Sequence, residues 1–134
     1  MLFRSISTFN ADTGGSAAST AVDARPVAVA VDPVRNLAVV ANAAQNTINL
    51  VDLGAAPVAV TARIAGPQLP TAVVFDPVTG FFLVGSSLAN TFLVVNPDTQ
   101  QIFPVRVGIN PTSMAYNFQS STLEIGRASC RERV

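Results

Sequence analysis

The sequence of 134 residues contains no histidine, no lysine and no tryptophan, and its single cysteine is Cys130. Without histidine, no serine or cysteine nucleophile can have an imidazole base beside it, so the usual nucleophile–base pairs are excluded within this segment. Metal sites built on imidazole or on several thiolates are excluded in the same way. Only a few dispersed carboxylates remain as candidate ligands.

Charge is also scarce, because charged residues make up 12% of the chain and eight basic residues balance eight acidic ones. Proteins that bind nucleic acid or an acidic membrane surface gather basic residues on one face, so we expect neither partner. No apolar run approaches the roughly 18 residues that a transmembrane helix needs. We therefore expect no membrane insertion.

The last residues have an origin of their own. Residues 125–134 resemble the translation of a short-read sequencing adapter, and the next adapter triplet is a stop codon. We therefore predict that residues 124–134 are an adapter-derived tail that is not native and that plays no part in the fold. Residues 1–123 then carry no cysteine and five arginines against six aspartates, a formal net charge of −1.

A repeat runs through the remaining chain. Pro26 is followed six residues later by Asp32; the same pattern recurs 44 residues on at Pro70, and loosely after a further 41 residues at Pro111. A period in the low forties built from short strands is the signature of a β-propeller, with one four-stranded sheet per repeat. The sequence predicts an all-β fold, a partial β-propeller of four-stranded antiparallel blades that form an open arc rather than a closed ring.

The repeat divides the chain into blades. Residues 26–69 and 70–110 are each predicted to form a complete blade, residues 111–123 the first strand of a following one, and residues 1–25 the outer strands of a preceding one. Runs rich in Val, Ile, Leu, Phe and Thr, separated by Gly, Pro, Asn and Asp, give the strands. The innermost strands are residues 27–31, 71–75 and 112–116, and the second strands are residues 37–41 and 81–85. The third strands are residues 47–51 and 91–95, and the outermost strands are residues 58–64 and 102–107.

The turns carry the clearest local signals. Residues 32–36 and 76–80 begin Asp-Pro and end in Asn36 or Gly80, which tolerate a positive φ and suit a type I turn closed by a bulge. Residues 9–14 resemble residues 95–100, so the chain is predicted to begin in mid-repeat. The inner strands are almost continuously apolar, which predicts sheets that pack on both faces.

The segment 37–52 resembles the bacterial YVTN-type β-propeller repeat. Residues 39–42 stand in for Tyr-Val-Thr-Asn, and Asn46, Thr47 and Asp52 match directly; the second copy keeps Asn90, Thr91 and Asn96 but has Ser86 where the first has Asn42. The resemblance implies a ring of about seven blades, of which this chain would hold about two and a half. It also implies an extracellular, periplasmic or cell-surface location in bacteria.

Several residues invite a functional interpretation, and for each one we favour a structural role. Asp32 and Asp76 could be metal ligands, but each precedes proline and can cap backbone N–H groups of its turn. Residues 12–14 spell the Asp-Thr-Gly of aspartic proteases inside a turn. Asn42, Asn46 and Asn90 are predicted to fix the hairpins between strands. Gly14, Gly15 and Gly54 do not have the spacing of a dinucleotide-binding or phosphate-binding loop. The strand phenylalanines are predicted to pack between blades; these are Phe81, Phe82, Phe92 and Phe103. We predict no catalytic, cofactor-binding or metal-binding residue.

The expected function is that of a non-catalytic segment of a larger bacterial protein. Its blades would be a scaffold for binding a protein or a small ligand, and the other blades of the parent propeller would be its neighbours. One alternative is a lactonase-like or quinoprotein-like enzyme whose catalytic residues lie outside this chain. Another is a surface-layer or adhesion module.

Overall fold

The computed structural model describes residues 4–106, 111–117, 119–120 and 122–127. Twelve β-strands and no helix occur in these ranges, so no helix among them could cross a membrane. The strands are β1 (Ser5–Phe9), β2 (Ser16–Ala21), β3 (Pro26–Asp32), β4 (Leu37–Asn42), β5 (Thr47–Asp52), β6 (Ala59–Ala65), β7 (Pro70–Asp76), β8 (Phe81–Ser86), β9 (Thr91–Val95), β10 (Ile102–Arg106), β11 (Pro111–Asn117) and β12 (Thr122–Arg127).

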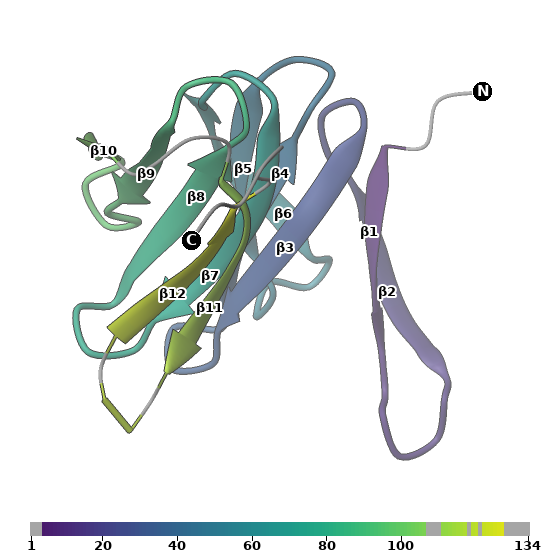
Figure 1. Ribbon diagram of the computed structural model, residues 1–134. Helices are drawn as coiled ribbons and strands as arrows, with labels where there is room; N and C mark the ends of the chain where they lie inside the picture. The colour runs from purple at the N-terminus through teal and green to yellow at the C-terminus, as the bar shows by residue number, and fades with distance from the viewer. Residues whose placement is uncertain (1–3, 107–110, 118, 121, 128–134) are drawn as a thin grey trace.

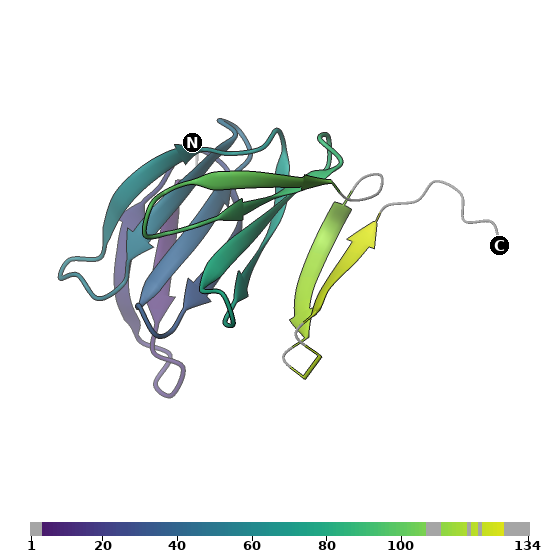
Figure 2. The ribbon, with the colours of Figure 1, turned by 90° about the vertical axis from the view of Figure 1, so that its left-hand side faces the viewer.

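The strands form four antiparallel sheets in chain order. Two sheets are complete, β3-β4-β5-β6 and β7-β8-β9-β10, and two are single hairpins, β1-β2 and β11-β12. The complete sheets stack face to face, with β1-β2 at one end of the stack and β11-β12 at the other (Figures 1 and 2). Strands β3 and β7 are in contact, and so are β7 and β11, so the first strand of each repeat lies on the inner side of the arc.

The three inner hairpins share one register. In β3-β4, β7-β8 and β11-β12 the pairing shifts just after the first proline, at Pro26, Pro70 and Pro111. Proline has no backbone N–H to give to the ladder, so it fits at a strand start or beside a bulge. The three prolines therefore occupy equivalent places, as the repeat predicts.

The core lies between the sheets. On one face of the first complete sheet, Val39 and Ile48 pack with Phe82 and Val84 of the second sheet. On its other face, Val40 packs with residues that include Val22 from the β2–β3 connection. Strand β4 is buried on both faces for this reason, which explains its unbroken apolar sequence.

The pattern differs in β3. Val27, Val29 and Val31 are exposed, while the alternate residues are half-buried. The hairpin β1-β2 lies beside the outer strands of the first complete sheet, through β2 and β6, and leaves the inner part of that face open. Strand β3 is therefore covered on one face only, as expected for the inner strand at the end of an open arc.

The end of the chain also differs from the prediction. We expected one strand after the second complete sheet and no pairing of residues 124–134, but β12 pairs with β11 up to Arg127. Leu123 and Ile125 are half-buried and Glu124 is exposed, the alternation of a strand with one covered face. Residues 128–134 and Val107 lie outside the described residues. The adapter origin of residues 124–134 stays a prediction.

Candidate functional site

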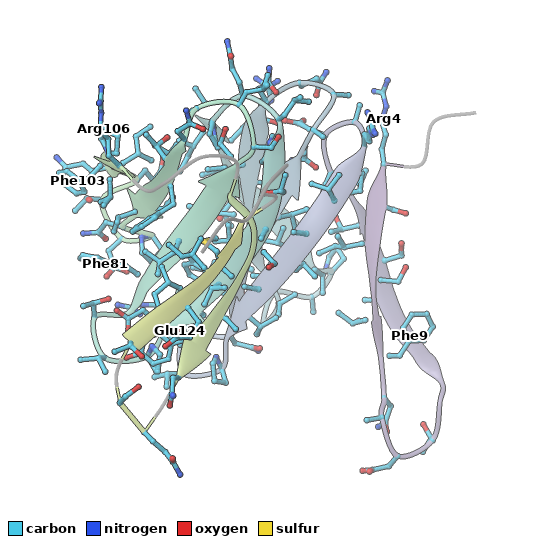
Figure 3. The ribbon with its side chains drawn as sticks, viewed as in Figure 1. Arg4, Phe9, Phe81, Phe103, Arg106 and Glu124 are labelled. Atoms are coloured by element: carbon cyan, nitrogen blue, oxygen red, sulfur yellow. The ribbon has the colours of Figure 1, made fainter. Side chains whose placement is uncertain are left out.

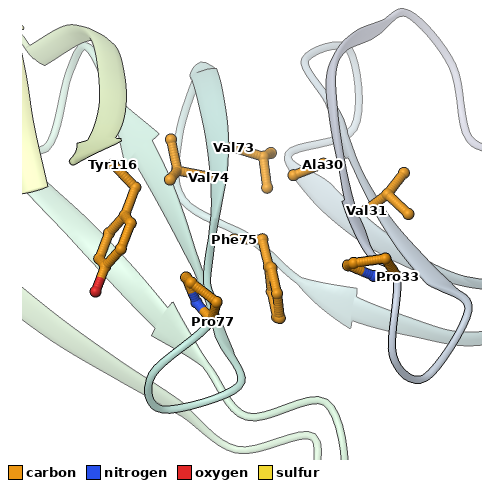
Figure 4. Close-up of a pocket in the computed structure, with 8 residues that line it drawn as sticks. All are labelled: Ala30, Val31, Pro33, Val73, Val74, Phe75, Pro77 and Tyr116. Carbon is orange, nitrogen blue, oxygen red and sulfur yellow. The ribbon is translucent and has the colours of Figure 1, made fainter. Parts of the chain in front are cut away.

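An apolar hollow of about 430 Å³ lies between the ends of the inner strands β3, β7 and β11. Figure 4 shows residues of all three strands and of two turns around this space, with Val73 and Val74 on opposite faces of β7. Its lining residues are Ala30, Val31, Pro33, Val73, Val74, Phe75, Pro77 and Tyr116. The volume falls in the range of small-molecule sites, which are mostly apolar with few polar groups.

The two Asp-Pro turns position the proline walls of the hollow. The carboxylate of Asp32 accepts hydrogen bonds from the backbone N–H groups of Val34 at 2.9 Å and Arg35 at 3.2 Å, and Asp76 accepts one from Val78 at 2.9 Å. The last turn residues, Asn36 and Gly80, have φ values of 55° and 75°. The predicted turn roles of both aspartates, and the need for a positive φ in the last slot, are confirmed.

Asp32 is fully buried and ionically paired. Arg35 donates to it at 2.8 Å and also to Asp98 of the next sheet at 2.9 Å, so one guanidinium joins two sheets. Burial raises the pKa of Asp32, but the hydrogen bonds from Arg35 and from the backbone outweigh this, and the pKa lies below its ordinary value. Hydrogen bonds to both carboxylates raise the pKa of Arg35.

The second turn is tied to the third repeat. Burial raises the pKa of Asp76, but hydrogen bonds from the Thr79 hydroxyl at 2.7 Å, from the Val78 N–H and from the Tyr116 side chain lower it below the ordinary value. The Tyr116 hydroxyl therefore serves the turn, while its ring lines the hollow (Figure 4). Most of the lining that a ligand would meet is apolar.

Three asparagines lie at the turns between β4 and β5 and between β8 and β9, at the opposite end of the strands from the hollow; they are Asn42, Asn46 and Asn90. Asn42 pairs with Pro26, the first residue of β3. Its buried amide nitrogen donates to Asn49 at 2.9 Å, while its Oδ1 accepts from no group among the described residues. Asn46 and Asn90 have φ values of 54° and 51°. Their predicted hairpin role is confirmed.

The Asp-Thr-Gly sequence lies in the turn between β1 and β2. Asn10 Oδ1 accepts from the N–H of Asp12 at 2.8 Å and of Thr13 at 3.0 Å. Asn96 does the same for Asp98 at 2.9 Å and Thr99 at 3.3 Å, between β9 and β10. The predicted equivalence of residues 9–14 and 95–100, and the turn role of this sequence, are confirmed.

One polar cluster was not found from the sequence. The carboxylate of Asp23 accepts from the Thr47 hydroxyl at 2.6 Å and forms an ion pair with Arg63. Burial raises the pKa of Asp23, but these bonds lower it below the ordinary value. Pro67 stands 44 residues after Asp23, so the repeat offered no signal. Within the described ranges, no three His, Cys, Asp or Glu side chains group as a metal site requires.

The aromatic residues divide into two sets. Phe82 is buried between the sheets, and its ring lies 5.1 Å from that of Phe75 at a tilt of 47°. The packing role predicted for Phe82 is thus confirmed. Phe103, on the outer strand β10, is 49% exposed and lies at the edge of the molecule (Figure 3), so the packing prediction is wrong for it.

Comparison with known proteins points to the fold. No family model matches the chain, and no curated protein matches it. Among solved structures, hydrazine synthase of Kuenenia stuttgartiensis aligns with a TM-score of 0.84 at 19% identity over 96% of this chain. A functionally unknown protein from Desulfotomaculum acetoxidans DSM 771 aligns with a TM-score of 0.72 at 17% identity over 84% of this chain. The alignment covers 37% of each of these longer chains.

The chain is a partial β-propeller. Its sheets are antiparallel and four-stranded where complete, they stack around their inner strands, and they form an open arc among the described residues. The likeness to a propeller-containing protein over nearly the whole chain agrees with this architecture.

Proposed function

We propose that this chain is a non-catalytic segment of a larger bacterial propeller protein and that it binds an apolar group of a small ligand or protein in the hollow. The observation that carries the proposal is an apolar hollow at the ends of the inner strands whose lining comes from three successive repeats. A rigid sheet scaffold holds these groups in place without further ordering, which lowers the entropy cost of binding.

The charged groups nearest the hollow support a binding role over a catalytic one. Asp32 is held by Arg35 and Asp76 by Thr79 and Tyr116, and both carboxylates have lowered pKa values. A general acid or base at neutral pH needs a pKa moved toward 7, the opposite direction for a carboxylate. The lactonase-like, quinoprotein-like and adhesion alternatives stay predictions, as does a periplasmic, extracellular or cell-surface location.

Titration with indole, monitored by methyl NMR, tests the hollow. We expect saturable shifts of the Val31, Val73 and Val74 methyl groups, because these groups line the hollow. Val31→Phe should fill part of the space and weaken indole binding at least tenfold.

The matched control is Val27→Phe, which places the same ring on the same face of β3 at its other end, outside the hollow. This variant should bind indole like the parent chain. Shifts spread equally over exposed valines such as Val34 and Val78, or equal effects of the two substitutions, would refute a site in the hollow.

A further inference from the structure

The described chain carries two half-sheets that complement each other. β1-β2 corresponds to the outer hairpin β9-β10, because its turn has the same Asn-centred hydrogen bonds. β11-β12 corresponds to the inner hairpin β7-β8, because it has the same register and the same shift after proline. We propose that two copies of the 134-residue chain associate so that β11-β12 of each copy joins β1-β2 of the other in a four-stranded sheet.

The inner side of this contact matches in shape. On β3, Val29 is 53% exposed between Val27 and Val31. The equivalent residues of β7 are Val73 and Phe75. They pack against the core between the two complete sheets, to which Ala28 and Ala30 of β3 also belong.

The strand that would cover the β3 ridge is β11 of the second copy. At the positions of Ala28 and Ala30 it has Ser113 and Ala115, which are also small and are both exposed. The free face of β11 can therefore pack against Val29 and Val31 of the other copy, in the way that the small residues of β3 pack against Val73 and Phe75 of β7.

The outer side of the contact matches as well. Phe103 is paired with Val94 and Val105 with Phe92, so these four apolar residues share one face of β9-β10. β11 contacts β7 and β8 of this sheet, its inner strands, which leaves Phe103 and Val105 exposed.

The residue that would cover this outer face is Phe9 on β1. It is 65% exposed and projects from the far end of the molecule (Figure 3), whereas its equivalents Val51 and Val95 are fully buried between sheets. In the proposed pair, Phe9 of one copy packs on Phe103 and its neighbours in the other.

Backbone pairing would join the half-sheets. Among the described residues, the sheet order gives β1 and β12 one neighbouring strand each. The equivalent strands β8 and β9 pair Phe82 with Val95 and Val84 with Leu93. The same register would place Leu123 opposite Phe9 and Ile125 opposite Ser7 of the other copy. Exposed strand edges are templates for such addition.

The number of sheets fixes the stoichiometry. Each copy supplies two complete sheets and two halves, which is three blades, so a pair closes with six. Propellers typically have about 4–8 blades, so one copy is too few and three copies, with nine, are too many. A head-to-tail contact that closes gives a ring of defined size and no open filament.

One residue opposes the association. Glu124 is exposed in β12 and occupies the place that Val39 and Leu83 fill between sheets. Its Oε1 accepts a hydrogen bond from the Thr122 hydroxyl at 2.9 Å. In the pair the side chain would face β4 of the other copy, and burying a carboxylate that has only a neutral hydroxyl as partner is unfavourable. Replacing Glu124 with leucine should therefore strengthen dimerisation. If Glu124 stayed exposed in solution, the substitution would not strengthen dimerisation.

Sedimentation equilibrium of the 134-residue chain tests the proposal. We expect twice the monomer mass of 13.9 kDa, in equilibrium with monomer. Val29→Arg should weaken dimerisation at least 100-fold without loss of folding, because Val29 is exposed in the single copy. Glu124→Leu should strengthen it about 100-fold, because each pair holds two such contacts and removal of the buried charge gains about tenfold, or about 1.4 kcal/mol, at each.

Val34→Arg is the matched control, since Val34 lies in a turn outside both contact faces and should leave dimerisation unchanged. A monomer at all concentrations, an open-ended series of oligomers, or a dimer that Val29→Arg does not weaken would overturn the proposal. The inference concerns the chain by itself and does not rest on the proposed function. Val31 lies at both surfaces, so the methyl shifts of Val73 and Val74 report on indole binding and the mass reports on the pair; either proposal can fail alone.

Discussion

Removing the Phe82 ring tests whether packing between the sheets holds the arc together. Phe82 is fully buried, contributes to the core shared by the two complete sheets, and lies 5.1 Å from the ring of Phe75. Burying a phenylalanine side chain is worth about 1.5–3 kcal/mol, and an aromatic pair adds about 0.5–1.5 kcal/mol. With the cavity that remains, Phe82→Ala should cost about 3–5 kcal/mol.

That loss is large beside the total stability of a domain, about 5–15 kcal/mol. Urea unfolding monitored by circular dichroism at low protein concentration measures it. With an m-value of about 1.5 kcal/mol per molar urea, a loss of about 4 kcal/mol lowers the midpoint by about 2.7 M.

Two valines provide a matched control, because the same substitution can be made inside and outside the core. Val39 is fully buried and Val34 is 90% exposed. Val39→Ala removes the equivalent of two buried methylenes, at about 0.8 kcal/mol each, and leaves a small cavity, so we expect a loss of about 2 kcal/mol. Val34→Ala should stay within about 0.5 kcal/mol of the parent. Equal losses in the two variants, or a loss below about 1 kcal/mol for Phe82→Ala, would refute a core between the sheets.

Three further predictions concern the Asp-Pro turns. Gly80→Ala places a Cβ 2.8 Å from Arg35 Nη1 at a φ of 75°, so urea unfolding should show a loss of about 1–3 kcal/mol, whereas Asn36→Gly in the equivalent slot should be close to neutral. Asp32→Asn removes the buried carboxylate that pairs with the partly exposed Arg35 and should lower the unfolding free energy at pH 7 by about 1–3 kcal/mol in urea unfolding; a change below about 0.5 kcal/mol would show that the turn does not need the charge. Asp32 and Asp76 have lowered pKa values in the folded state, so the unfolded chain binds more protons in acid. The free energy of unfolding should therefore be highest above about pH 4 and fall as the pH drops through the folded pKa values. In Asp32→Asn this fall should be less steep. Equal unfolding free energies at pH 6 and pH 3 would contradict this.

The local chemistry of the turns was predictable because it depends on neighbours in sequence. An Asp or Asn side chain that accepts from the N–H groups two or three residues further on needs only the residues of its own turn, and the structure shows this at Asp32, Asp76 and Asn96. Asn36 and Gly80 share a slot because its positive φ excludes most other residues.

Contacts between repeats were not predictable in this way. Arg35 reaches Asp98, 63 residues away, and Asp23 meets Arg63, 40 residues away. Neither pair joins equivalent positions of two repeats, so the sequence pattern does not predict that its two residues meet. The hollow is likewise a product of three strands that meet only in the tertiary structure.

The sequence by itself determined the repeat, the strands and the turn chemistry of this protein, because these depend on residue types at short and regular spacings. Only the tertiary structure decided which faces are covered. Val29 and Val39 are both apolar strand residues, yet Val39 is buried between two complete sheets and Val29 is exposed beside a half-sheet. Burial depends on what stands opposite a side chain, and that is set by the stacking of sheets distant in sequence.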